Sequence, residues 1–206
     1  GTQNVEGVTP DPDRHFFAEE ATGTWCQWCP RGAVFMDYMK ETYGNTFVGI
    51  AVHNADPMVV SAYDQAMGNV IAGYPSVVAD HVNVIDPSDL EASMLDVIAN
   101  PVHCTVSGTA TVNATTGAMN IDLSTTFMMA MSGDYRFMAV VAEDSVTGTA
   151  ATYNQTNAYG NNANGPMGGF ESFGTSVPAA SMNYNFVNRA LLGGWTGQAA
   201  SIPGSV

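Results

Sequence analysis

Residues 15–35 read HFFAEEATGTWCQWCPRGAVF, and their pattern predicts a strand followed by a turn and a helix. Residues 15–21 are mostly apolar and predict a strand, which a turn then follows. Proline suits the first position of a helix, so we expect a helix over Pro30–Tyr43. The apolar residues that recur at helical spacing within it are Val34, Phe35, Tyr38 and Met39.

Two cysteines, Cys26 and Cys29, lie where this strand passes into the helix. The free N–H groups and the positive dipole end of the helix N-terminus would favour a thiolate at the first sulfur. Such a thiolate can attack a disulfide, and the second cysteine can then resolve the mixed disulfide. The same spacing occurs in zinc sites, but a second ligand pair is missing, and Pro30 stands where haem attachment requires His.

Outward from this segment, the sequence predicts alternating strands and helices up to about residue 100. Thr46–His53 is apolar enough to be a strand buried on both faces, as in a parallel sheet. Asp56-Pro57 predicts the N-cap and first turn of a helix from Met58 to about Ile71. The last elements expected here are the strands Ser76–Ala79 and Val82–Ile85 around a turn at Asp80-His81, and a helix from Asp86-Pro87 to about Ala99.

This order, β-α-β-α-β-β-α, indicates an α/β domain over residues 14–100, preceded by an N-terminal extension over residues 1–13. After Asn100-Pro101 the composition shifts to Thr, Ser, Gly and Val with alternation of period two, which predicts an all-β, sandwich-like domain over residues 101–206. The four strands expected there are 102–113, 118–126, 135–143 and 183–192.

A long loop over residues 145–181 separates the last two of these strands and has no helical or strand period. Four strands make only half a sandwich. We therefore expect the domain to be incomplete, or a partner or second copy to cover its open edge by self-association. Cys104, on the first of these strands, is expected to be a buried, inert thiol.

The composition and charge of the chain argue against several classes of function. With 46% hydrophobic and 12% charged residues, the chain can bury a substantial core. Its net charge of −14 disfavours binding to nucleic acid, and no run approaches the roughly 20 apolar residues needed for membrane insertion. Gly1 follows neither an initiator Met nor a signal-peptide pattern, so a processed or trimmed chain is expected. We assign no metal, because His81 and His103 lack ligand spacing, and His53, although it ends a strand where ligand sites collect, is expected to hydrogen-bond the Asp56 cap.

The strand, the WCQWCP stretch over residues 25–30 and the later Gly73-Tyr74-Pro75-Ser76 together resemble the thioredoxin superfamily. The resemblance implies that the Tyr74-Pro75 bond is cis, and that Pro75 faces the cysteines and pairs with the backbone of a substrate. It also implies that Glu20, six positions before Cys26, is the family's buried acid and accepts the proton of Cys29 through water. Glutamate departs here from the commoner aspartate.

Residues 19–26, 29–32 and 53–58 are similar to the outer-membrane-protein-28-related family of Bacteroidetes, and residues 142–144 and 188–195 look like its C-terminal half. This resemblance implies a thioredoxin-like domain joined to a β-sandwich-like region. It also implies a periplasmic, outer-membrane-associated or secreted location.

Two functions follow as hypotheses. The first is a thiol-disulfide oxidoreductase that acts on protein thiols or disulfides and needs no dissociable cofactor. The second is a non-catalytic surface or interaction protein in which Cys26 and Cys29 form a structural disulfide. Three aromatic residues are candidates for substrate contact: Trp25 beside the sulfur pair, Tyr74, and Trp28, which either is exposed for docking or folds back onto Phe17 or Tyr74. Glu20 could equally reach solvent.

Overall fold

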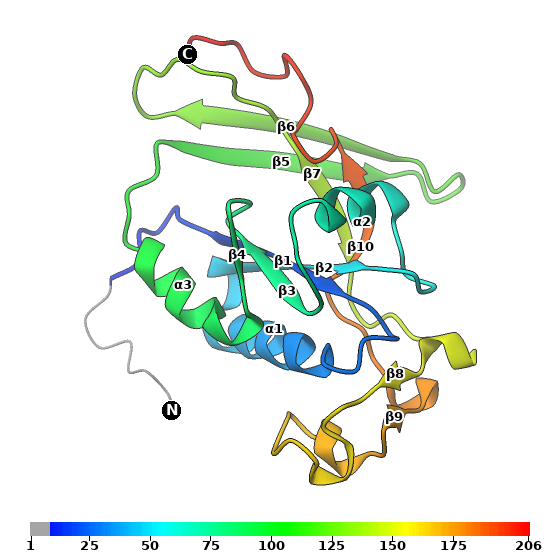
Figure 1. Cartoon of the computed structure of the whole chain (residues 1–206). Helices are drawn as coiled ribbons and strands as arrows, with labels where there is room; N and C mark the ends of the chain where they lie inside the picture. The colour runs from blue at the N-terminus through cyan, green and yellow to red at the C-terminus, as the bar shows by residue number, and fades with distance from the viewer. Residues whose placement is uncertain (1–8) are drawn as a thin grey trace.

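The computed structural model describes residues 9–206, so most of the expected N-terminal extension over residues 1–13 lies outside the described residues (Figure 1). A six-stranded mixed sheet with the order β4-β3-β1-β2-β10-β7 forms the centre. β1 and β2 are parallel, with Phe16 opposite Phe47, and β3 is antiparallel to β1. The strands of this sheet are β1 (Phe16–Thr22), β2 (Phe47–His53), β3 (Ser76–Ala79), β4 (Asn83–Ile85), β7 (Ala139–Glu143) and β10 (Val187–Leu192).

Helices cover both faces of the sheet (Figure 1). α1 (Pro30–Tyr43) and α3 (Leu90–Val97) pack on one face, where Phe16 and Phe47 belong to the same buried cluster as residues of both helices. α2 (Ser61–Gly68) packs on the other face through Tyr63 and Met67. Successive residues of a strand point to opposite faces, so neighbouring residues of β1 meet different helices.

Most expected elements of the first half are present, with shifts at the caps. α1 has the expected bounds. α2 begins at Ser61 rather than Met58, because the Asp56 carboxylate accepts the N–H of Met58 at 2.9 Å in a preceding turn and does not cap the helix. Similarly, Asp86 caps the short 3-10 turn η2 (Pro87–Asp89) that precedes α3, by accepting the N–H of Ser88.

The sequence indicated a separate domain after residue 101. The structure corrects this, because strands of the second half belong to the central sheet. β7 and β10 extend the central sheet, with Val187 of β10 opposite Ala51 of β2 and the two strands parallel. The N–H of Ala51 donates to the carbonyl of Phe186 at 2.7 Å. β2 therefore lies between β1, which pairs along its whole length, and β10, which pairs with it at Ala51.

β5 (Cys104–Val112) and β6 (Met119–Phe127) form a separate antiparallel ribbon rather than part of a sandwich (Figure 1). Cys104 is a free thiol of intermediate exposure, so the expectation that it is buried is corrected: a two-stranded ribbon has no second layer to cover it. The short strands β8 (Gln155–Thr156) and β9 (Ser176–Val177) pair within the expected 145–181 loop. In the part of the chain from Thr9 onward, the helices are too short or too polar to cross a bilayer.

Candidate functional site

The two cysteines at the start of α1 form a disulfide. β1 ends at Thr22, and the chain turns so that the N–H of Cys26 donates to the carbonyl of Gly23 at 3.0 Å. Cys29 occupies the N-cap of α1, and Pro30 follows at the first helical position, as the sequence predicted. The pair therefore lies at the positive end of the helix dipole.

Both sulfur-bearing residues are covered. Cys26 is 4% exposed and Cys29 is 1% exposed. Residues 152–160 lie against the turn that holds the cysteines. They belong to the loop over residues 145–181, to which the sequence assigned no chemistry. Gln155 Nε2 donates to the carbonyl of Cys26 at 2.9 Å, and the N–H of Ala158 donates to the carbonyl of Gln27 at 2.8 Å. Apart from the length of the loop, the sequence carries no signal that identifies Gln155 with the site.

The aromatic residues around the disulfide stay partly exposed. Trp25, 47% exposed, packs edge-on against Tyr74 with ring centroids 5.3 Å apart, and its Nε1 donates to the carbonyl of Asn54. Trp28, 41% exposed, packs against Tyr159 at 5.7 Å rather than against Phe17 or Tyr74. The sequence could not supply this partner, because Tyr159 lies in the distant covering segment. The Tyr74-Pro75 peptide bond is cis.

Glu20 is buried on the α1 face of the sheet, at 2% exposure, and its Oε1 has no hydrogen-bond partner. Burial raises its pKa to about 8, opposed by a hydrogen bond from Thr22 and supported by the nearby charge of Asp37. α1 leaves room for this carboxyl at Gly32, where any Cβ would collide with it. Of the two interpretations left open by the sequence, the buried carboxyl is the one observed.

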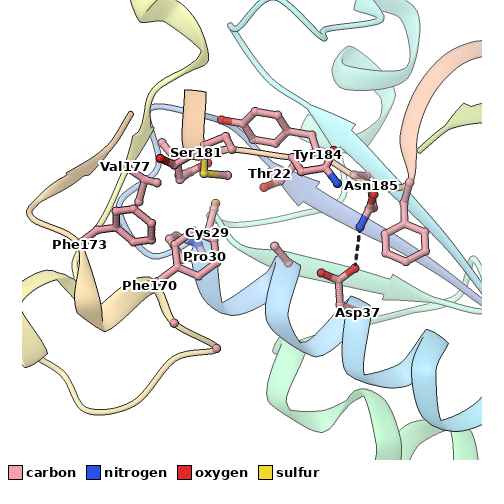
Figure 2. Close-up of a pocket in the computed structure, with 18 of the residues that line it drawn as sticks. Thr22, Cys29, Pro30, Asp37, Phe170, Phe173, Val177, Ser181, Tyr184 and Asn185 are labelled. Atoms are coloured by element: carbon pink, nitrogen blue, oxygen red, sulfur yellow. Dashed lines mark hydrogen bonds between the residues drawn. The ribbon is translucent and has the colours of Figure 1, made fainter. Parts of the chain in front are cut away.

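A cavity of about 360 Å³ lies between α1, the sheet and the segment 168–186 (Figure 2). Glu20 and Cys29 both line it. Figure 2 shows the Cys29 side chain directed into this space, between Thr22 and the aromatic rings of Phe170 and Phe173. His53 also belongs to the lining, and its Nδ1 lies 2.7 Å from Asp56 Oδ2, the structural role that the sequence favoured.

Asp37, on α1, is a lining residue that the sequence did not single out. Its Oδ1 accepts a hydrogen bond from Asn185 Nδ2 at 3.1 Å (Figure 2). Burial raises the pKa of this carboxyl, and the charges of Glu41 and Asp144 raise it further, while the hydrogen bond from Asn185 lowers it. The cavity wall therefore holds two carboxyl groups whose ionisation is disfavoured by their surroundings.

On the opposite face, Glu19 is completely buried but fully partnered. The Tyr63 hydroxyl donates to its Oε1, and His81 Nδ1 lies 2.7 Å from its Oε2. His81 Nε2 lies 3.0 Å from the carbonyl of Trp195, which links β1 to the C-terminal segment. Burial raises the pKa of Glu19, while the Tyr63 and His81 contacts oppose this. This group faces away from the disulfide and serves packing.

The chain was compared with family models, curated proteins and solved structures, and only solved structures are similar to it. The chain matches no protein-family model and no curated protein. Its structure is similar to a structural-genomics target from Agrobacterium tumefaciens, with 14% identity, a TM-score of 0.46, and coverage of 88% of this chain and 72% of that one. It is also similar to HBP35 of Porphyromonas gingivalis, with 13% identity and a TM-score of 0.55 over 96% of this chain. The chain spans 63% of the length of HBP35. It therefore shares its fold with a protein from a species of the Bacteroidetes.

Proposed function

We propose that this protein is a thiol-disulfide oxidoreductase built on a thioredoxin-like domain, with Cys26 as the attacking cysteine and Cys29 as the resolving one. The observation that carries the proposal is the buried carboxyl of Glu20, whose Oε1 has no hydrogen-bond partner, in the wall of the cavity that Cys29 also lines. A buried carboxyl without a partner costs stability. A disulfide that only braced the fold would need no such group beside it.

The residues fit the two steps of disulfide exchange. The Cys26 thiolate attacks one sulfur of a substrate disulfide, forms a mixed disulfide and releases the other substrate sulfur as a thiolate. Cys29 then gives its proton to the Glu20 carboxylate, through water, and attacks the Cys26 sulfur. The enzyme is left with its disulfide, and the substrate has gained two electrons and leaves as a dithiol. The reverse sequence oxidises a dithiol.

The environment of Glu20 suits this proton transfer. A carboxyl with a pKa of about 8 can both hold and release a proton near neutral pH, whereas an exposed carboxyl is ionised there. Pro75, with Tyr74 beside Trp25, is proposed from the thioredoxin resemblance to present the backbone of a protein substrate. The disulfide itself fits an oxidising location, so we propose the cell envelope or secretion.

The access of a protein substrate to Cys26 requires a change in the structure. Because Cys26 is buried, a protein substrate can reach it only when surrounding residues move, and we propose that residues 152–160, which donate to the Cys26 and Gln27 carbonyls, are the segment that moves. This burial favours a second candidate function, a non-catalytic interaction protein that keeps the scaffold and a static disulfide. The two candidates differ in whether the reduced Cys26 reacts.

Insulin reduction, followed by turbidity in the presence of dithiothreitol, tests the proposal. The wild type should accelerate precipitation, and Cys26→Ser should abolish the acceleration. Cys104→Ser, which removes the free thiol on the β5–β6 ribbon, is the matched control and should leave the rate unchanged. A wild-type rate equal to that of dithiothreitol alone would reject the oxidoreductase.

Iodoacetamide labelling of the reduced protein at mildly acidic pH tests the attacking role separately. Cys26 should be alkylated before Cys29, because its thiolate is favoured at the helix N-terminus. Gln155→Ala removes the hydrogen bond to the Cys26 carbonyl and should increase the labelling rate severalfold. Equal labelling of both cysteines in both proteins would favour the static disulfide.

A further inference from the structure

The cavity beside Cys29 has two unlike walls. One wall comes from the segment 168–186 and is largely apolar; it includes Phe170, Phe173, Val177, Met182, Tyr184 and Phe186. The other comes from α1 and the sheet and carries the carboxyl groups of Glu20 and Asp37. Among the described residues that line the cavity, none is Lys or Arg. Its one basic side chain, His53, is held by Asp56 through Nδ1.

The size of the cavity suits a small organic molecule. Its volume of about 360 Å³ lies within the range of ligand pockets, roughly 300–1,000 Å³, and far exceeds the ~30 Å³ that one water occupies in the liquid. Gly168, Gly169 and Ser172 are among its lining residues that are also exposed.

The hydrogen bonding of Glu20 indicates which chemical group a ligand in the cavity would carry. Its Oε1 is buried without a hydrogen-bond partner, although nearly all buried polar atoms have one. When Glu20 is ionised its oxygens only accept hydrogen bonds, so a donor in the cavity would stabilise that state. Asp37 already accepts from Asn185, and its second carboxyl oxygen provides a further acceptor in the same wall.

We propose that this cavity binds a small organic ammonium ion that carries an apolar or aromatic group. The ammonium donates hydrogen bonds to Glu20 and is attracted by the charge of Asp37, while the apolar group packs among the rings of the segment 168–186. Aromatic faces also attract ammonium ions, which strengthens the selection of a cation over a neutral molecule of the same shape. The site shares Glu20 and Cys29 with the chemistry proposed for the cysteines, but binding of the amine does not require that chemistry.

Calorimetric titration with 2-phenylethylamine and with its neutral counterpart 2-phenylethanol tests the site in the oxidised protein. The amine should bind at least tenfold more tightly than the alcohol. Glu20→Gln should remove most of this difference and leave the affinity for the alcohol unchanged. Glu143→Gln is the matched control, because Glu143 is exposed, is paired with Arg189 and does not line the cavity; it should bind as the wild type does.

Proton release gives a second readout. An ammonium beside the Glu20 carboxyl lowers its pKa, so binding at pH 7 should release close to one proton, measured as the dependence of the binding enthalpy on the buffer. Glu20→Gln should release none. Phe173→Ala tests the apolar wall in a variant that keeps both carboxyls, and it should weaken amine and alcohol alike.

The double variant Cys26→Ser/Cys29→Ser separates this site from the redox proposal. It should bind the amine as the wild type does, whatever the result of the insulin experiment. Absence of heat with either compound, or equal affinity for amine and alcohol, would overturn the proposal.

Discussion

The two faces of β1 bury adjacent glutamates in opposite ways. Glu19 points toward α2 and has Tyr63 and His81 as partners for both carboxyl oxygens. Glu20 points toward α1, and its Oε1 has none. Both side chains are almost fully covered, and burial raises the pKa of both. What differs is the set of groups that the facing elements bring to each carboxyl.

The difference separates a structural carboxyl from a functional one. A partnered group stabilises the fold through its hydrogen bonds and resists replacement. A buried carboxyl oxygen without a partner costs stability, and for Glu20, which lines the cavity beside Cys29, we propose a chemical task. We assign that task to disulfide exchange through Cys29 and to the ligand of the cavity. The following predictions test the contrast, beginning with the largest effect.

Glu19→Ala should lower the free energy of unfolding by about 4 kcal/mol at pH 7, because it leaves Tyr63 and His81 without their shared acceptor and opens a cavity. Glu20→Gln should not lower it and should raise it by up to about 3 kcal/mol under the same conditions, because glutamine removes the cost of keeping Glu20 protonated in the fold. Urea denaturation followed by circular dichroism measures both. Similar losses in the two variants would contradict the contrast.

The stability should depend on pH through Glu20. Its pKa is about 8 in the folded protein against 4.5 in the unfolded chain, so between these values the folded state holds a proton that the unfolded state lacks. This contribution is complete below pH 4.5 and is lost as the pH rises through 8. The slope for one proton is about 1.4 kcal/mol per pH unit, or about 3 kcal/mol between pH 5 and pH 7.

Urea denaturation of the wild type and Glu20→Gln at pH 5, 6 and 7 isolates this slope. Glu19 and Asp37 also have raised pKa values and contribute in the same direction in both proteins. The fall should therefore be shallower in Glu20→Gln. Parallel curves would show that Glu20 is ionised in the fold.

Gly32→Ala should destabilise the protein by about 2 kcal/mol, because the new Cβ collides with the Glu20 carboxyl. In a Glu20→Ala background the same change should be neutral or stabilising by up to ~1 kcal/mol, as alanine is the better helix former. Gly68→Ala in α2, where a Cβ meets nothing, is the control for helix propensity. Thermal denaturation of the wild type, the two single variants, the double variant and the Gly68→Ala control measures the coupling between positions 20 and 32. Additive effects would show that the Glu20 carboxyl does not lie against Gly32.

Thr22→Val should have the smallest effect. It removes the hydrogen bond that lowers the pKa of Glu20, so that pKa should rise further, by about one pH unit or less. The measurement is a pH titration of the Glu20 carboxyl carbon by NMR. Thr24→Val, whose hydroxyl donates instead to the carbonyl of Thr152, should leave the titration unchanged.

The first half of the fold could be predicted in detail because its signals are local. Pro30 and the apolar spacing that follows it define α1, and the apolar run after it defines β2. Errors arose where two local interpretations compete: Asp56 can cap a turn as well as a helix, and hydrogen bonds to Met58, Thr24 and His53 occupy it here. The four strands of the second half were located to within a few residues, but the partners of β7 and β10 were not.

By itself, the sequence determined the position of the disulfide at the mouth of α1, because strand, turn and proline-led helix follow one another within fifteen residues of chain. The tertiary structure decided the rest of the site. It placed Gln155 over Cys26, aromatic residues of the segment 168–186 opposite Glu20, and β10 beside β2. These pairings join residues more than a hundred positions apart, and they depend on how surfaces fit after collapse rather than on any local pattern.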